Sequence, residues 1–153
     1  MNNDTQYKLM TASSHADDVV RMMNHLYDDD PSGSVDRTRF RQTIDLILSN
    51  PDHGNIVLFM RADMLCGYAL VIPYLSNEWG GTIAFIDELF VEPDFRGQGI
   101  GSGFIEYLRK VRPFSAVAIF LEVSRQNMRA RKLYDSLGFQ ERSHQLLTLR
   151  IGV

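Results

Sequence analysis

The sequence contains one cysteine, Cys66, among its 153 residues. A single thiol excludes a framework of internal disulfides and a metal site built from cysteines, and this cysteine usage is typical of a reducing compartment. The four histidines lack the mutual spacing of metal ligands, so we expect no metal site. We therefore expect a cytoplasmic protein that works without a metal.

Long apolar runs and basic clusters are also missing. No run approaches the roughly 20 apolar residues that cross a bilayer, and the first five residues are polar rather than signal-like, so we expect no membrane partner. The formal net charge is −3 and no cluster of lysine or arginine stands out, which argues against a nucleic-acid partner. An acidic surface suits a cationic substrate better.

The composition fits one globular domain covering residues 1–153, since 44% of the residues are hydrophobic and 23% are charged. Hydrophobic periodicity and turn residues predict a mixed α/β chain. The expected strands cover residues 7–11, 55–61, 65–74, 83–91, 116–123 and 144–151. The expected helices cover residues 14–27, 36–50, 100–111 and 127–137. The helix between the strands at 83–91 and 116–123 predicts a parallel pair with a right-handed crossover.

A glycine-rich turn joins the strand at 83–91 to the helix at 100–111. The turn follows Pro93 and carries Gly97, Gly99, Gly101 and Gly103. Small residues before a helix leave backbone N–H groups pointing outward, and with the helix dipole these groups favour a phosphate or pyrophosphate. The alternative is an ordinary strand-to-helix turn that binds no anion.

Two common phosphate loops do not fit this turn. The dinucleotide fingerprint requires a glycine where the two possible frames have Ser102 and Phe104. The Walker loop requires Lys followed by Ser or Thr after its last glycine, and no such pair is present. The pattern that fits is Arg or Gln, two residues, Gly, one residue, then Gly or Ala, which Arg96, Gly99 and Gly101 satisfy.

This loop, together with the preceding Leu89, Phe90, Val91 and Pro93, resembles that of the GCN5-related N-acetyltransferases (GNAT family). The resemblance covers about residues 56–152 well, and the first third only by element order. It implies the acyl-CoA N-acyltransferase fold, with a mixed, mostly antiparallel sheet of about six to seven strands and about four helices. It further implies acetyl-CoA as cosubstrate, a primary amine of a small molecule as acceptor, and a homodimer as a common assembly.

The resemblance also assigns site residues. Backbone groups of the strand end would hold the pantetheine arm, the loop would hold the pyrophosphate, and Asn127 would contact the cofactor from the last helix. The expected cofactor-binding residues are Leu89, Phe90, Val91, Arg96, Gly97, Gln98, Gly99, Ile100, Gly101, Ser102 and Asn127. Tyr134, in N-x-x-A-x-x-L-Y-x-x-L-G-F, would lie near the thioester sulfur, although a tyrosine at this spacing can also be packing.

Acyl transfer to an amine requires removal of a proton, because an alkyl ammonium has a pKa of roughly 10.4 in water. Asp87 and Glu88 are adjacent on the central strand and resemble the acid pair of polyamine acetyltransferases. Their side chains should point to opposite faces unless a bulge intervenes. We expect one of them to act as base and Tyr134 to protonate the departing thiolate. The alternative for the pair is a structural role, as an ion pair or a turn cap.

Several alternatives stay open at this point. The acceptor could be a peptide or protein amine, or the chain could be a non-catalytic acyl-CoA sensor or a nucleotide-binding protein. The acidic segment 28–30 is either a solvated turn or, by the resemblance, a rim that attracts an ammonium group. Glu78 and Trp79 either face the substrate or cover the edge of the core.

Overall fold

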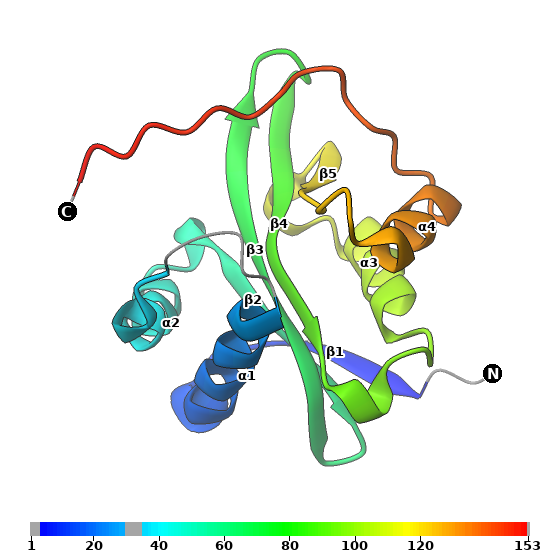
Figure 1. Cartoon of the computed structure of the whole chain (residues 1–153). Helices are drawn as coiled ribbons and strands as arrows, with labels where there is room; N and C mark the ends of the chain where they lie inside the picture. Colours follow the sequence, from blue (N-terminus) through cyan, green and yellow to red (C-terminus); the bar gives the residue numbers. More distant parts are fainter. Residues whose placement is uncertain (1–3, 30–34, 153) are drawn as a thin grey trace. The chain divides into compact units, whose positions relative to one another are not determined.

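The computed structural model describes residues 4–29 and 35–152, which form two compact units divided after Glu122. The first unit contains a mixed sheet with helices on both faces (Figure 1). Its strands are β1 (Thr5–Leu9), β2 (Asn55–Arg61), β3 (Met64–Ser76), β4 (Gly81–Val91) and β5 (Ala118–Leu121). Its helices are α1 (Ala16–Asp29), α2 (Phe40–Ser49) and α3 (Ile100–Val111).

The sheet follows the chain order β1-β2-β3-β4-β5. The three pairs among β1 to β4 are antiparallel, and β5 is parallel to β4. The parallel pair and its helical crossover are therefore confirmed. The described residues hold five strands, fewer than the sequence predicted.

The face of the sheet that α1 and α2 cover is the main apolar core. Val19, Met22 and Met23 of α1 and Phe40 and Ile44 of α2 are buried, as the helical periodicity predicted. Ile56, Leu58 and Met60 of β2 point to the same core, because alternate residues of a strand share a face.

The opposite face packs on α3. Phe59 of β2 lies 5.0 Å from Phe104 of α3 between ring centroids, and Tyr7 of β1 lies 5.3 Å from Phe59. The Tyr7 hydroxyl also donates a 2.7 Å hydrogen bond to the carbonyl of Ile100, the first residue of α3. This contact fixes the start of α3 against the sheet.

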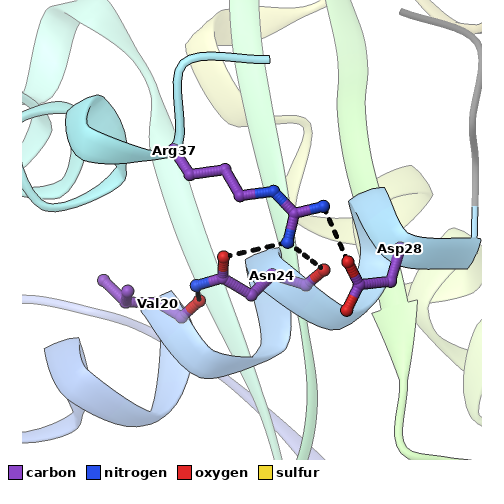
Figure 2. Close-up of polar contacts among 4 residues, drawn as sticks. All are labelled: Val20, Asn24, Asp28 and Arg37. Atoms are coloured by element: carbon purple, nitrogen blue, oxygen red, sulfur yellow. Dashed lines mark hydrogen bonds and ion pairs between the residues drawn. The ribbon is translucent and has the colours of Figure 1, made fainter. Parts of the chain in front are cut away.

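Hydrogen bonds and an ion pair of Arg37 join the end of α1 to the segment that begins α2 (Figure 2). The Arg37 guanidinium donates to the Asn24 carbonyl at 3.4 Å, to Asn24 Oδ1 at 3.2 Å and to Asp28 Oδ1 at 2.7 Å. Asn24 Nδ2 in turn donates to the Val20 carbonyl at 2.9 Å. The Asp28 charge is thereby compensated, whereas Asp30 lies outside the described residues. Asp36, the expected cap, accepts from the Thr38 N–H at 3.1 Å.

The second unit contains α4 (Met128–Ser136). Its Asn127 N-cap accepts from the Ala130 N–H at 3.1 Å, and Gly138 after the helix has φ of 88°, as expected for a C-terminal cap. The strand predicted at 144–151 is wrong: these residues are neither strand nor helix, and Leu146, Leu147, Leu149 and Ile151 are exposed. An alternating apolar pattern forms a strand only where a neighbouring strand pairs with its backbone, and the sequence pattern does not supply that neighbour.

Candidate active site

The candidate site lies where β4 continues past β5. The parallel register begins at Ile83↔Ala118 and ends at Ile86↔Leu121, while β4 runs on to Val91 in register with β3. The last residues of β4 therefore have an edge that β5 does not cover. Those residues are Asp87, Glu88, Leu89, Phe90 and Val91, which are the acid pair and the expected backbone contacts of the pantetheine arm.

A β-bulge lies at the point where this edge opens. On β3, Leu70 pairs with Glu88 and its neighbour Val71 pairs with Ile86, so Asp87 is the extra residue of β4. The bulge reverses which residues of β4 share a face, and Glu88 joins Leu70 and Phe90 on the side of α1 and α2. The structure therefore contains the bulge that interrupts strict alternation of side chains at the acid pair.

The two acids consequently have different environments. Asp87 is exposed, and partial desolvation of its carboxyl raises its pKa above the ordinary value. Glu88 is 7% exposed and accepts two hydrogen bonds, from the Tyr27 hydroxyl to Oε1 and from the Tyr68 hydroxyl to Oε2, both at 2.8 Å. Of the two acids, Asp87 is therefore the one that a solvent-borne amine can approach.

The Glu88 carboxyl also has a raised pKa. Desolvation by burial is the main cause, the two tyrosine hydrogen bonds oppose it, and the charge of Asp87 adds to it. The same burial and the neighbouring Glu88 raise the pKa of the Tyr68 hydroxyl, so the tyrosine stays protonated and donates. Tyr68 is fully buried in β3.

We expect Glu88→Gln to change how stability depends on pH. A carboxyl whose pKa is raised on folding stabilises the protein below the unfolded pKa and loses that contribution as the pH rises through the folded pKa. Between acidic and neutral pH, the melting temperature of the wild type should therefore fall by a few degrees more than that of Glu88→Gln. Thermal unfolding of both proteins from pH 4.5 to pH 8, with Glu106→Gln as an exposed control, measures this difference. Parallel curves for wild type and Glu88→Gln would contradict the expectation.

The glycine turn has the geometry that an anion site needs. Gly97 and Gly99 have φ of 75° and 79°, in the region that favours glycine, and Gly99 is the N-cap of α3 without a side-chain cap. The first hydrogen bond of the helix runs from the Gly103 N–H to the Gly99 carbonyl at 2.9 Å. The N–H groups of Ile100, Gly101 and Ser102 precede that bond and have no acceptor within the helix. With the helix dipole, these groups fit the pyrophosphate of a coenzyme A.

The side chains of the motif hold the loop itself. Arg96 Nε donates to the Val91 carbonyl at 2.8 Å, its guanidinium carbon lies 5.4 Å from the Phe90 ring centroid, and it pairs with Asp29 at 3.4 Å. Gln98 Nε2 donates to the Asp94 carbonyl at 3.0 Å. Arg96 and Gln98 thus support the turn, and the cofactor contacts expected of them remain predictions.

Asn127, expected to contact the cofactor, and Tyr134, expected near the thioester sulfur, lie in the second unit. Asn127 uses Oδ1 to cap α4. Burial raises the pKa of the Tyr134 hydroxyl, whose ring packs edge-on against Phe139 with 5.5 Å between centroids. The hydroxyl is therefore protonated at neutral pH, as that of an ordinary tyrosine also is, and its role as an acid stays a prediction.

Sequence reasoning missed three neighbours of the site. Tyr27 and Tyr68 bind the Glu88 carboxylate, although each lies far from it in the sequence. Arg61, at the end of β2, donates to Gln98 Oε1 and to Thr5 Oγ1. No short motif marks these contacts, which form only after β3 has paired with β4 and the end of β2 lies against the glycine turn. Trp79 is 45% exposed and packs edge-on against Phe120 of β5 at 5.4 Å.

Among the described residues, no helix has the length and apolar character needed to cross a bilayer. The same residues contain no group of three or more His, Cys, Asp or Glu side chains placed to hold a metal ion.

The family model described as "Acetyltransferase (GNAT) family" matches residues 20–139, which include β2 to β5, the glycine turn and α4. The chain belongs to the GNAT family. The chain resembles a thialysine N-epsilon-acetyltransferase of Bos taurus with 36% identity over 77 residues, 49% of this chain and 44% of the relative. It thus spans less than half the length of this curated relative.

Solved structures share the GNAT fold over nearly the whole chain. A possible acetyltransferase from Clostridium difficile 630 superposes with a TM-score of 0.83 at 15% identity, over 97% of this chain and 99% of that one. The aminoglycoside N-acetyltransferase AAC(6')-Iy in complex with CoA gives a TM-score of 0.77 at 18% identity, over 95% and 94% of the two chains. The fold class predicted from the sequence is therefore confirmed, with fewer strands than expected.

Proposed function

We propose that this GNAT protein is an N-acetyltransferase that uses acetyl-CoA to acetylate a primary amine of a small molecule. The observation that carries the proposal is the end of β4, where an exposed carboxylate stands on a bulge beside an uncovered strand edge that leads into the glycine turn. The turn offers N–H donors for a pyrophosphate, the strand edge offers main-chain groups for the pantetheine arm, and Asp87 offers a base. The curated relative named for the ε-amine of thialysine supports a primary amine as acceptor.

Acetyl-CoA supplies the activated acyl group as a thioester. In the proposed reaction, Asp87 accepts the ammonium proton, directly or through one water, so that a neutral amine nitrogen attacks the acetyl carbonyl. The N–C bond forms, the C–S bond breaks, and the Tyr134 hydroxyl gives its proton to the departing thiolate sulfur. Main-chain N–H groups of Leu89 to Val91 polarise the carbonyl as charge develops on its oxygen. Glu88 does not contact the amine and supports Asp87.

We expect Tyr134→Phe to lower kcat for amine acetylation about a hundredfold while leaving the affinity for acetyl-CoA nearly unchanged. The substitution removes the donor and retains the ring that packs on Phe139. Steady-state release of CoA and calorimetric titration of acetyl-CoA measure the two quantities. Tyr107→Phe is the matched control, since burial also raises the pKa of Tyr107, which packs on Tyr7 and Phe104 of the α3 face. Unchanged turnover in Tyr134→Phe would remove Tyr134 from the acid role.

A two-stage experiment tests the function itself. Acetyl-CoA should raise the melting temperature, and CoA should then be released when polyamines, lysine analogues and aminoglycosides are added one at a time. Release of CoA with a peptide that has a free N-terminus, but with none of the small amines, would favour a peptide acceptor. Protection by acetyl-CoA without release by any acceptor would favour a non-catalytic sensor.

A further inference from the structure

Glu88 is buried away from the uncovered strand edge, yet it stands next to the residue that we assign as base. The bulge at Asp87 turns Glu88 toward α1, where Oε1 meets the Tyr27 hydroxyl and Oε2 meets the Tyr68 hydroxyl. Each oxygen of the Glu88 carboxylate thus accepts a hydrogen bond from the protein, and the two bonds fix the orientation of the side chain. The position of Glu88 in turn limits where the backbone of the bulge can lie.

The two tyrosines come from different parts of the first unit. Tyr68 belongs to β3, the strand already paired with β4 through the main chain, so its bond to Glu88 adds a tie within the sheet. Tyr27 belongs to the last turns of α1, so its bond joins a helix to the bulge. Its ring stacks on Phe40, the first residue of α2, with 5.4 Å between centroids and 24° between planes.

The same end of α1 has two further attachments. Asp28 binds Arg37 ahead of α2, and Asp29 pairs with Arg96 of the glycine turn (Figure 2 shows the first). Of the three contacts, only the Tyr27 hydrogen bond reaches the acid pair. In this bond the Tyr27 hydroxyl lies 2.8 Å from Oε1 of the buried Glu88 carboxylate. Both ion pairs are exposed and contribute little energy on their own.

We propose that Tyr27 is a positioning residue that acts through Glu88: its hydrogen bond fixes the bulge against α1 and so sets where Asp87 meets the acceptor amine. This inference rests on the proposed function, because it assigns Asp87 the role of base. The two acids then have different roles: Asp87 exchanges the proton, and Glu88 positions the bulge through its hydrogen bond to Tyr27 of α1.

The test is a double-mutant cycle with Tyr27→Phe and Glu88→Gln. Tyr27→Phe keeps the ring that stacks on Phe40, so the protein should fold, and kcat/KM for the amine should fall about tenfold with KM for acetyl-CoA unchanged. The double variant should lose less than the sum of the two single losses, because both changes act on the same contact. Fully additive losses, or kinetics within twofold of wild type with only a lower melting temperature, would overturn the inference.

Arg37→Ala is the matched control, since it releases the same end of α1 without touching Glu88. Its kcat/KM should stay within about twofold of wild type, as expected for an exposed ion pair. A loss as large as that of Tyr27→Phe would mean that docking of the helix, rather than the bond to Glu88, sets the geometry, and would overturn the inference.

A carboxyl titration by ¹³C NMR keeps the inference separate from the proposed function, because it needs no turnover. The groups that face Glu88 are Tyr27 from α1, Tyr68 from β3 and Asp87 from β4. Since the Tyr27 hydrogen bond lowers the pKa of Glu88, Tyr27→Phe should raise that pKa and perturb the titration of Asp87. If neither titration changes, the inference fails even in an active enzyme. If the wild type acetylates no amine, the proposed function fails, and the role of Tyr27 in placing a base fails with it.

Discussion

Replacing Gly99 with Asp should abolish measurable binding of acetyl-CoA without unfolding the protein. Gly99 is the N-cap of α3, directly before the N–H groups that we expect to meet the pyrophosphate. A carboxylate there would lie close to the bound phosphates, and two like charges about 4 Å apart repel by about 4 kcal/mol at an effective dielectric constant near 20. Since about 1.4 kcal/mol corresponds to tenfold in affinity, we expect a loss of a hundredfold or more by calorimetric titration.

Gly99→Asn is the control that isolates charge. Gly99 has φ of 79°, which costs most side chains roughly 1–2 kcal/mol, whereas Asn and Asp both tolerate this region comparatively well. Both variants should melt within a few degrees of each other, and Gly99→Asn should retain much more affinity than Gly99→Asp. Equal affinities in the two variants, or wild-type affinity in Gly99→Asp, would place the anion site elsewhere.

Asp87→Asn should lower kcat/KM for the amine about a hundredfold to a thousandfold, with acetyl-CoA affinity retained. Asparagine keeps the shape of the side chain and cannot accept the ammonium proton. Because desolvation raises the pKa of Asp87, the wild-type rate should fall as the pH drops through a value above the ordinary range for aspartate. Asp87→Asn should lose that acid limb of the pH profile.

Glu88→Gln is the matched comparison for Asp87→Asn, since it makes the same change at the adjacent acid. Its rate should fall less, because Glu88 is buried against two tyrosines and supports the bulge instead of exchanging the proton. A larger loss in Glu88→Gln than in Asp87→Asn would reverse the two roles.

The glycine turn and its helix could be predicted from local sequence. Gly99 and the apolar spacing of Ile100, Phe104 and Leu108 locate α3, and the helix begins at Ile100 as expected. The physical reason is that an N-cap in a positive-φ conformation and an amphipathic period act over a few neighbouring residues. The parallel arrangement of β5 on β4 followed from the length of the crossover, which is also a local quantity.

The division of roles within the acid pair could not be predicted. It depends on the β3–β4 register, in which one extra residue moves Glu88 to the other face, and a register is a property of two strands together. The tyrosine donors of Glu88 come from positions 27 and 68, so both hydrogen bonds to Glu88 are present only after α1 has packed on the sheet. For the same reason, the alternating segment at 144–151 carried the pattern of a strand without the partner that a strand requires.

Calorimetric titration of the wild-type protein with acetyl-CoA tests the central claim most directly, with dephospho-CoA, pantetheine and ATP as comparison ligands. If the N–H groups at the start of α3 bind the pyrophosphate and the edge of β4 binds the pantetheine arm, acetyl-CoA should bind with one site per chain. Dephospho-CoA should then retain most of the affinity, while pantetheine and ATP, which each lack one of these two parts, should bind much more weakly. Absence of acetyl-CoA binding at millimolar concentration, or ATP binding as tight as that of acetyl-CoA, would contradict the account.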